Sequence, residues 1–349
     1  MNVKKTITLN FFVAKSSILS FSPLNFFPFG IIILRKTKVN NSVMDIKKIF
    51  SGKLTSILLG VIVCIFWGSN YPFIKMSYSA FAIDSSSIPA IMLMAGMRFL
   101  VCGIAFITIL GTKEKKLKLP DKTNILPILA IGMITIVIHY TLTYAGISMC
   151  ESSKSSILKQ IGYLFISCFA FVFVKSDKFT FGKLIGGILG FLGIIAVNMN
   201  GLNLSFGVGE LFILLASLFS ATGTIVSKYV FKYHEPVFCT AYSQFIGGVI
   251  LIVAGLVMGG RFGRVGIDSV AILLYICFSS VVAYSIWNTL IKYNDISKMS
   301  IIKYLEPLFG VIFSGIILGE NIFRLSYLFA FLLIIAAIIA GNLKTKKSG

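Results

Sequence analysis

Two short stretches, Ser156-Ile157-Leu158-Lys159 and Ser300-Ile301-Ile302-Lys303, repeat one pattern at an offset of 144 residues. Each stretch lies near the start of a long apolar run, so a lysine falls just inside a segment that is long enough to cross a bilayer. Neighbouring residues match at the same offset: Tyr140 with Tyr284, Glu151 with Asp295, Lys154 with Lys298, and Leu164-Phe165 with Leu308-Phe309. Such an internal duplication is typical of transporters that are built from two similar halves.

The composition indicates a helical membrane protein. Hydrophobic residues make up 57% of the 349 residues, charged residues 13%, and the mean hydropathy is +0.93, whereas globular domains carry about 25% charge. The apolar runs are continuous and about 20 residues long, which fits helices rather than the short alternating segments of membrane barrels. The net charge of +20 comes from lysines concentrated in short loops, so we expect no nucleic-acid partner.

The apolar runs predict ten spans connected by short loops. They cover residues 54–74, 88–110, 123–146, 153–174, 181–199, 208–229, 236–258, 269–291, 299–318 and 324–342. With the N-terminus placed in the cytoplasm, the inner segments hold 18 Lys or Arg residues and the outer loops hold 5. Because basic residues concentrate on the cytoplasmic side, we predict a multi-pass protein of the cell (plasma or inner) membrane with both termini in the cytoplasm.

The first five spans pair with the last five, and five is an odd number, so the second half is inserted upside-down. Arg98-Phe99 aligns with Gln244-Phe245, and Lys75 aligns with Lys228. We therefore predict an all-α polytopic membrane protein of ten transmembrane helices in two inverted five-helix repeats, at residues 44–201 and 202–349. Such repeats place the substrate path between the halves, near the midplane of the bilayer.

Residues 1–43 differ from the rest of the chain. They are rich in Phe, Ser, Asn and Lys, and their best apolar run, at residues 26–34, contains Pro28 and is too short to span a bilayer. Met44-Asp45-Ile46-Lys47-Lys48 has the character of a natural start. We expect residues 1–43 to be a disordered or spurious N-terminal extension.

Three further stretches resemble a known family. They are Trp67-Gly68-Ser69-Asn70-Tyr71-Pro72-Phe73-Ile74-Lys75, Met97-Arg98-Phe99-Leu100, and Tyr304-Leu305-Glu306-Pro307-Leu308-Phe309-Gly310 with the following Leu318-Gly319-Glu320. These motifs are similar to those of EamA-type members of the drug/metabolite transporter superfamily. The resemblance covers about residues 50–342 and implies ten helices in inverted repeats. It also implies transport of small metabolites, commonly amino acids or drugs, often as export. The family tends to carry apolar or small residues where this chain has Lys159 and Lys303.

Charged side chains inside the hydrocarbon are candidate functional residues, because they are costly there unless they pair, face a cavity or snorkel. Arg98 lies about eleven residues into its span, too deep for easy snorkelling. It either contacts an anionic substrate group or donates structural hydrogen bonds. Lys159 and Lys303 lie about one turn inside their helices. They form paired sites for an anionic group, each exposed in one state of alternating access, or they snorkel to nearby headgroups.

Pro307 bears on the role of Lys303. Proline has no N–H, so it leaves the carbonyl four residues earlier, that of Lys303, without its helical partner. Glu306 lies one turn from Lys303 and is placed to pair with it. The two form a neutral structural ion pair at a kink, or Glu306 couples to a proton or to the substrate.

Aromatic, amide and imidazole groups in three spans provide further candidates for lining a ligand cavity. They are Trp67, Asn70, Tyr71, His139, Tyr140, Tyr144, Tyr284, Trp287 and Asn288. The alternative role of the aromatic residues is packing, and His139 is also a candidate proton relay. With Arg98, Lys159, Lys303 and Glu306, they form the predicted substrate-binding set, and we predict no catalytic residues, metal ligands or cofactors.

We therefore predict a secondary transporter, not an enzyme, for an amino acid, a carboxylate or a related small metabolite. Export is the expected direction. The sequence has no phosphate-cradling loop, so a gradient or exchange would drive transport.

The expected partners are a small-molecule substrate and the lipid bilayer, with protons or another coupling ion and a homodimer left open. The alternatives are a non-transporting membrane scaffold or accessory protein and, less favoured, a membrane-embedded enzyme. Basic side chains that converge on one cavity would favour transport.

Overall fold

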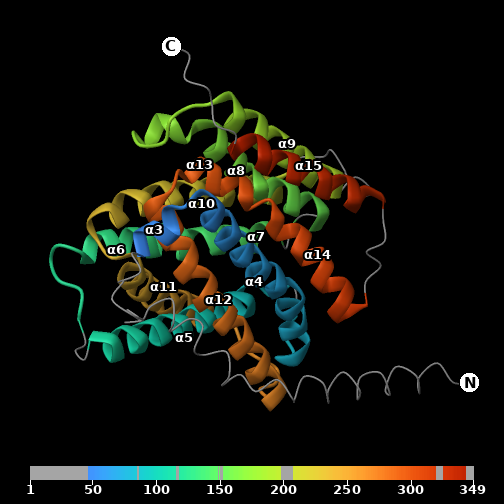
Figure 1. Cartoon of the computed structure of the whole chain (residues 1–349). Coiled ribbons are helices and arrows are strands. Elements are labelled where there is room, and N and C mark those ends of the chain that lie inside the picture. Colours follow the sequence, from blue (N-terminus) through green and yellow to red (C-terminus); the bar gives the residue numbers. More distant parts are fainter. Residues whose placement is uncertain are drawn as a thin grey trace, which may run out of the picture. The chain divides into compact units, whose positions relative to one another are not determined.

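The computed structural model describes residues 46–342, apart from residues 85, 115–117, 148, 150–151, 198–206 and 320–324. The predicted N-terminal extension, residues 1–43, lies outside the described residues. Within these ranges the chain is helical and has no strand (Figure 1). The elements are α3 (Ile46–Ser51), α4 (Lys53–Ala80), α5 (Ile88–Glu114), α6 (Ile125–Gly132), η2 (Met133–Ile138), α7 (His139–Ile147), α8 (Ser152–Phe173), α9 (Phe181–Val197), α10 (Val208–Tyr233), α11 (Pro236–Val257), α12 (Ile267–Tyr293), α13 (Ile296–Ile302), α14 (Leu305–Leu318) and α15 (Leu325–Asn342).

Eight helical segments of the described chain are long and apolar enough to cross a membrane, with α6–η2–α7 and α13–α14 each counted as one segment. Two further apolar helices, Leu158–Phe173 and Phe181–Ala196, are shorter. Each predicted span overlaps one of these segments, but the predicted edges were inaccurate. The first span was predicted to end at residue 74, whereas α4 continues to Ala80. Lys75 on that extra turn is exposed, so its charge does not end the helix.

The ninth predicted span is divided where Pro307 predicts a weakened helix. α13 ends at Ile302 and α14 begins at Leu305. The carbonyl of Lys303 accepts a hydrogen bond from the amide of Glu306 at 3.0 Å, three residues on, because Pro307 cannot donate one. The helix axis is therefore interrupted at the position from which the Lys303 side chain projects.

A short π-helical segment, η2, interrupts the third predicted span between α6 and α7. The wider turn ends immediately before His139, the first residue of α7. Such π-helical segments are frequent at functional sites. The apolar sequence of η2 contains no residue that marks this segment.

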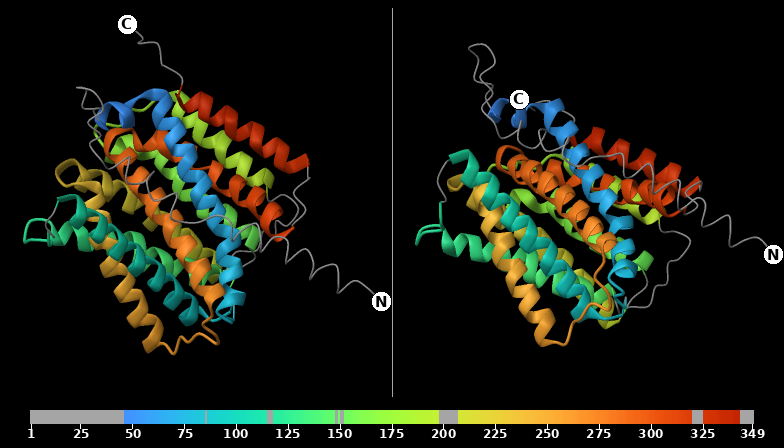
Figure 2. Two further views of the ribbon diagram at one scale, coloured as in Figure 1. Left: turned by 60° about the horizontal axis from the view of Figure 1, so that its bottom comes forward. Right: turned by 90° about the horizontal axis from the view of Figure 1, so that it is seen from below.

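Close backbone contact joins α5 to α11. A Cβ atom added to Gly96 would lie 2.7 Å from the backbone nitrogen of Ile252 and 2.9 Å from the carbonyl oxygen of Gly248. Only glycine permits this approach, as in other membrane helix pairs that meet through small residues. A second pair, α9 and α15, runs side by side (Figure 2). In the centre, α4 packs against α12 and α14, and α10 packs against α7 and α8.

Candidate functional site

A cavity of about 280 Å³ lies among the central helices. Its wall is built from α4, α5, α6, η2, α7, α8, α10, α11, α12 and the α13–α14 segment. All thirteen residues of the predicted substrate-binding set line it: Trp67, Asn70, Tyr71, Arg98, His139, Tyr140, Tyr144, Lys159, Tyr284, Trp287, Asn288, Lys303 and Glu306. The structure thus brings the whole set together, while the binding role of these residues stays a prediction.

Lys303 lies deep in the wall, with only 4% of the residue exposed. Its ammonium group forms an ion pair with the Glu306 carboxylate. Three aromatic rings surround the same ammonium: that of Trp67 at 3.4 Å, Trp287 at 5.1 Å and Tyr163 at 5.5 Å from the ring centres. Rings at these distances attract a cation through their negative faces. Lys303 therefore does not snorkel to a headgroup.

Glu306 connects the kinked segment to α4. Besides pairing with Lys303, its carboxylate accepts a hydrogen bond from the Tyr71 hydroxyl at 3.3 Å. Tyr71 also packs near Gly310, where an added Cβ atom would lie 3.0 Å from the ring. The first and ninth predicted spans thus meet through one charged group at the cavity wall.

Arg98 is also buried, with 6% of the residue exposed. Its Nε donates a hydrogen bond to the Ser280 hydroxyl at 3.0 Å, and its guanidinium lies 5.3 Å from the ring centre of Phe99. Ser280 donates in turn to the carbonyl of Ile276 at 2.5 Å. No carboxylate of the described chain forms a salt bridge with Arg98. The other N–H groups of this guanidinium are suited to donate hydrogen bonds to an anionic group.

Lys159 differs from its sequence counterpart Lys303. Its side chain is half-buried and lines the cavity. No hydrogen bond or ion pair among the described residues involves its ammonium group. The two lysines occupy equivalent positions in the duplicated sequence but differ in charge balance. Glu306 neutralises Lys303, whereas no described carboxylate forms an ion pair with Lys159.

Two buried amide side chains on the cavity wall lack hydrogen-bond partners. Both polar atoms of Asn70 and both of Gln244 are buried without a partner. A buried polar group without a partner costs about 1–3 kcal/mol, so a bound ligand or water would stabilise it. Asn288 differs, because its Nδ2 donates to the Thr240 hydroxyl at 2.6 Å.

Aromatic contacts make up much of the remaining wall. Trp67 packs edge-on against Tyr284 at 5.1 Å and against Trp287 at 5.8 Å. His139 stacks on Tyr140 at 4.8 Å, and Tyr140 contacts Tyr144 at 5.7 Å. These rings provide a rigid apolar surface beside the charged groups, which is the usual character of a small-molecule pocket.

Several lining residues lie outside the predicted substrate-binding set. The missed polar and aromatic ones are Tyr78, Thr135, Thr143, Tyr163, Ser220, Thr224, Ser227, Thr240, Ser243 and Gln244. Ser220, Thr224 and Ser227 recur at the spacing of one helix face, a signal that could have identified them. Gln244 was noted only as the residue aligned with Arg98. No group of three or more His, Cys, Asp or Glu residues in the described ranges is placed to hold a metal ion.

The charge of the wall is unbalanced. Arg98, Lys159 and Lys303 contribute three cations, and Glu306 is the one carboxylate among the described lining residues. The Lys303–Glu306 pair is internally neutral, so the excess positive charge lies at Arg98 and Lys159. Because isolated charge is unfavourable at low dielectric, an anionic group in the cavity would be stabilised.

The comparisons agree with a membrane transporter. The model of the EamA-like transporter family matches residues 54–199 and again residues 207–341. The uncharacterized transporter YvbV of Bacillus subtilis is 27% identical over 296 residues, 84% of this chain and 92% of its own length. The uncharacterized inner membrane transporter YedA of Escherichia coli K12 is 26% identical, over 79% of this chain and 87% of its own. A probable amino-acid metabolite efflux pump from the same strain is 25% identical, over 79% and 91%.

A solved crystal structure has the same fold. It superposes with a TM-score of 0.67 at 15% sequence identity and covers 83% of this chain and 98% of its own. At that identity the likeness concerns the fold alone. The two family matches together cover most of the chain, including every helix that lines the cavity. The protein is a multi-pass membrane transporter, and the chain belongs to the EamA-like transporter family.

Proposed function

We propose that the protein exports a small metabolite bearing a carboxylate, such as an amino acid, by alternating access between two inverted halves. The observation that carries the substrate class is the excess positive charge at Arg98 and Lys159 on the cavity wall. The convergence of both residues and Lys303 on one cavity favours transport over a scaffold role, because a scaffold has no use for charged side chains gathered in a cavity. The direction is suggested by the relative named as an efflux pump.

We propose ten membrane spans in two repeats, residues 44–201 and 202–349, with α8 and α9 as the two short spans. The packing supports this division, because the most extensive helix contacts have counterparts in the other half. The first span α4 packs on α12 and α14, the third and fourth of the second half, as α10 packs on α7 and α8. The second spans α5 and α11 pair with each other, as do the fifth spans α9 and α15. The two matches of the family model fall on the same halves.

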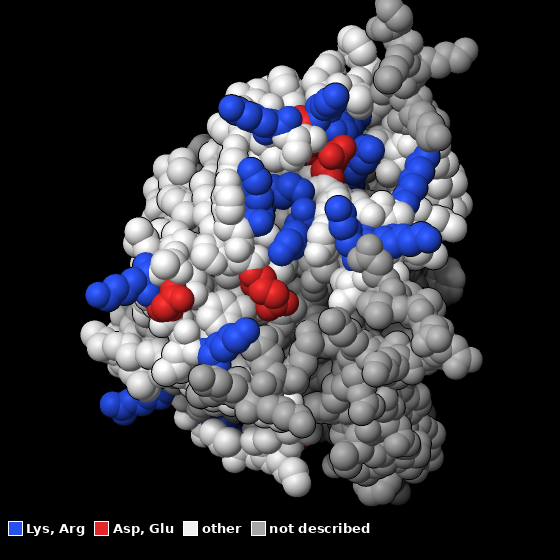
Figure 3. All heavy atoms as spheres, turned by 60° about the vertical axis from the view of Figure 1, so that its left-hand side comes forward, with Lys and Arg blue, Asp and Glu red and all other residues white. Residues whose placement is uncertain are grey.

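We place the protein in the cell membrane with both termini in the cytoplasm. The distribution of basic residues supports this orientation. On one face of the molecule Lys and Arg side chains gather with few acidic ones among them (Figure 3). The face that carries more basic residues is usually cytoplasmic.

We propose separate roles for the charged groups, and their contacts support this division. In our proposal Arg98 and Lys159 receive the substrate carboxylate, and the amides of Asn70 and Gln244 complete its hydrogen bonds. We propose the proton as the coupling ion, with Glu306 as its site, because Glu306 is the carboxylate of the described wall. The hydrogen bond from Tyr71 joins the Glu306 carboxylate on the kinked segment to α4. Protonation of Glu306 would weaken this bond as well as the pair with Lys303, and so loosen a contact between the halves.

The test is counterflow in liposomes that contain the purified full-length protein, with radiolabelled amino acids and simple carboxylates as substrates. We expect uptake of at least one carboxylate, reduced at least tenfold in Arg98→Gln and Lys159→Met, about the effect of losing one charge-assisted contact. Lys232→Met is the matched control, because Lys232 is exposed and does not line the cavity. Unchanged flux in both cavity variants would refute the carboxylate proposal, and flux of organic cations alone would do the same.

A further inference from the structure

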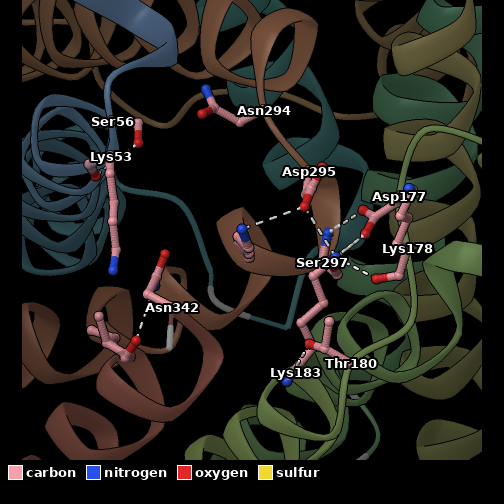
Figure 4. Close-up of polar contacts among 12 residues, drawn as sticks. Lys53, Ser56, Asp177, Lys178, Thr180, Lys183, Asn294, Asp295, Ser297 and Asn342 are labelled. Carbon is pink, nitrogen blue, oxygen red and sulfur yellow. Dashed lines mark hydrogen bonds and ion pairs between the residues drawn. The ribbon is translucent and has the colours of Figure 1, made fainter. Parts of the chain in front are cut away.

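A second pocket, of about 490 Å³, shares no lining residue with the central cavity. It lies between the first turn of α4, the loop between α8 and α9, the start of α13 and the last turn of α15. Figure 4 shows its polar side chains: Lys53 and Ser56 from one side, Lys178, Thr180 and Lys183 from the other, with Asp295 between them. Four lysines line this pocket, and Asp295 is the one acidic residue among the described lining residues.

The two acidic groups near the pocket, Asp177 and Asp295, already have a basic partner in Lys183. The buried Lys183 ammonium lies 2.5 Å from Oδ1 of Asp177 and 3.0 Å from Oδ2 of Asp295. The Lys183 ammonium also donates a hydrogen bond to the backbone carbonyl of Lys178 at 2.7 Å. All three hydrogens of this ammonium therefore have acceptors. Asp177 accepts two further hydrogen bonds from Ser297, from the backbone amide at 2.9 Å and from the hydroxyl at 2.6 Å. Lys183 and the two carboxylates thus form a closed structural network.

The remaining lysines have no comparable partner. Lys298 lies 3.5 Å from the already paired Asp295 and is partly exposed. The Lys53 and Lys178 ammonium groups form no ion pair or hydrogen bond with any described residue. Together with Asp177, the pocket has four ammonium groups for two carboxylates. This excess, with the hydroxyls of Ser176 and Thr180 on the wall, favours an anion with several oxygen acceptors, such as a phosphate group.

The position of the pocket indicates where that anion comes from. α4 begins at Lys53, α9 begins at Phe181 and α15 ends at Asn342, so the pocket lies where three membrane helices end. Headgroups of anionic lipids occupy this level of the bilayer, and basic pockets between helix ends bind them. We propose that this pocket binds the phosphate of an anionic phospholipid headgroup. In this proposal the phosphate contacts Lys53 of α4, Lys178 of the loop and Lys298 of α13, and so strengthens the link that the Asp177–Lys183–Asp295 network already makes.

The experiment compares the full-length protein in nanodiscs of phosphatidylcholine with and without increasing phosphatidylglycerol. The thermal unfolding midpoint should rise with phosphatidylglycerol, because a ligand that binds only the folded form stabilises it. Each surface lysine contributes about fivefold in affinity for an anionic lipid, so Lys53→Gln/Lys178→Gln should weaken the apparent affinity about 25-fold. Lys175→Gln is the matched control, since Lys175 is exposed in the same loop but does not line the pocket.

Both side chains changed in the double variant lack described partners, so its midpoint in pure phosphatidylcholine should equal that of the wild type, which checks folding. A second variant, Lys53→Arg/Lys178→Arg, keeps the charge and should keep the affinity. The proposal is overturned if phosphatidylglycerol gives no stabilisation, or if Lys175→Gln loses as much affinity as the double variant. Inorganic phosphate is added to protein in phosphatidylcholine nanodiscs as a separate arm. An equal stabilisation there would overturn the lipid as the source of the phosphate.

Discussion

Replacing Lys303 by Met should destabilise the protein strongly, and replacing Glu306 by Gln at the same time should cost little more. The two groups form an ion pair in which 5% of the Lys303 side chain and 13% of the Glu306 side chain is exposed. Removing one partner of a buried pair leaves the other charge uncompensated and costs about 3–5 kcal/mol. Because Glu306 borders a cavity that water can enter, we expect the lower end of that range, about 3 kcal/mol, for Lys303→Met.

The aromatic rings around Lys303 set the second term. The ammonium lies 3.4 Å from the ring centre of Trp67, and a desolvated contact of this kind is worth about 2 kcal/mol. Lys303→Met loses this contact, whereas Glu306→Gln retains it, so the second variant should cost less, about 2 kcal/mol. The double variant leaves no charge uncompensated. It loses the ring contact, about 2 kcal/mol, and weakens the hydrogen bond from Tyr71 to the carboxylate, about 1 kcal/mol, so it should lose about 3 kcal/mol in total. The two single effects would sum to about 5 kcal/mol, so the expected coupling energy is about 2 kcal/mol.

Unfolding free energies of the four proteins, measured by denaturant titration in mixed micelles, give this coupling directly. Lys159→Met is the control, because Lys159 is the sequence counterpart of Lys303 and has no ion pair among the described residues. It should change the unfolding free energy by less than about 1 kcal/mol. If the Lys303 and Glu306 effects add without coupling, or if Lys159→Met costs as much as Lys303→Met, the reasoning is wrong.

Three further substitutions test other contacts. Arg98→Lys keeps the charge but loses the planar donor that bonds Ser280, so the affinity for a transported carboxylate should fall about tenfold, measured by a binding titration. Gly96→Ala places a Cβ atom against the backbone of α11 and should cost about 1–3 kcal/mol, seen as a lower thermal unfolding midpoint. Asp177→Asn removes one of the two carboxylates that neutralise buried Lys183 and should cost about 3 kcal/mol, while an unchanged unfolding free energy would show that the network is dispensable.

The features that could be predicted from the sequence are those that depend on residues close together in the chain. The interruption at Lys303 follows from the missing N–H of Pro307, and the ion pair follows from the three-residue spacing of Lys303 and Glu306. Depth within an apolar run identified Arg98, because a charge far from either end of a span must face protein or a cavity. These arguments need no knowledge of how distant helices pack.

The partners of the same residues could not be predicted, since they come from distant parts of the chain. Ser280, which accepts the hydrogen bond of Arg98, is 182 residues away in sequence. Tyr163 faces Lys303 from α8, and a tyrosine in an apolar run gives no sign of which helix face it occupies. Gln244 is uncharged, so its depth in the span did not mark it as a candidate residue. In the structure both polar atoms of its amide are buried on the cavity wall without a hydrogen-bond partner. The π-helical segment before His139 has no charged or proline residue to mark it.

The duplicated lysines show how two equal positions acquire unequal roles. Only the second copy is followed by Glu306 and Pro307, whereas the residues after Lys159 are Gln160, Ile161 and Gly162. The carboxylate and the kink turn Lys303 into half of a neutral pair held by aromatic rings, and the first copy keeps its charge. A duplication alone would produce a cavity with matched charges on both sides of its symmetry axis. The presence of Glu306 and Pro307 after only one of the two lysines instead leaves an excess positive charge beside Arg98. That asymmetry is why we expect the substrate carboxylate at Lys159 rather than at Lys303.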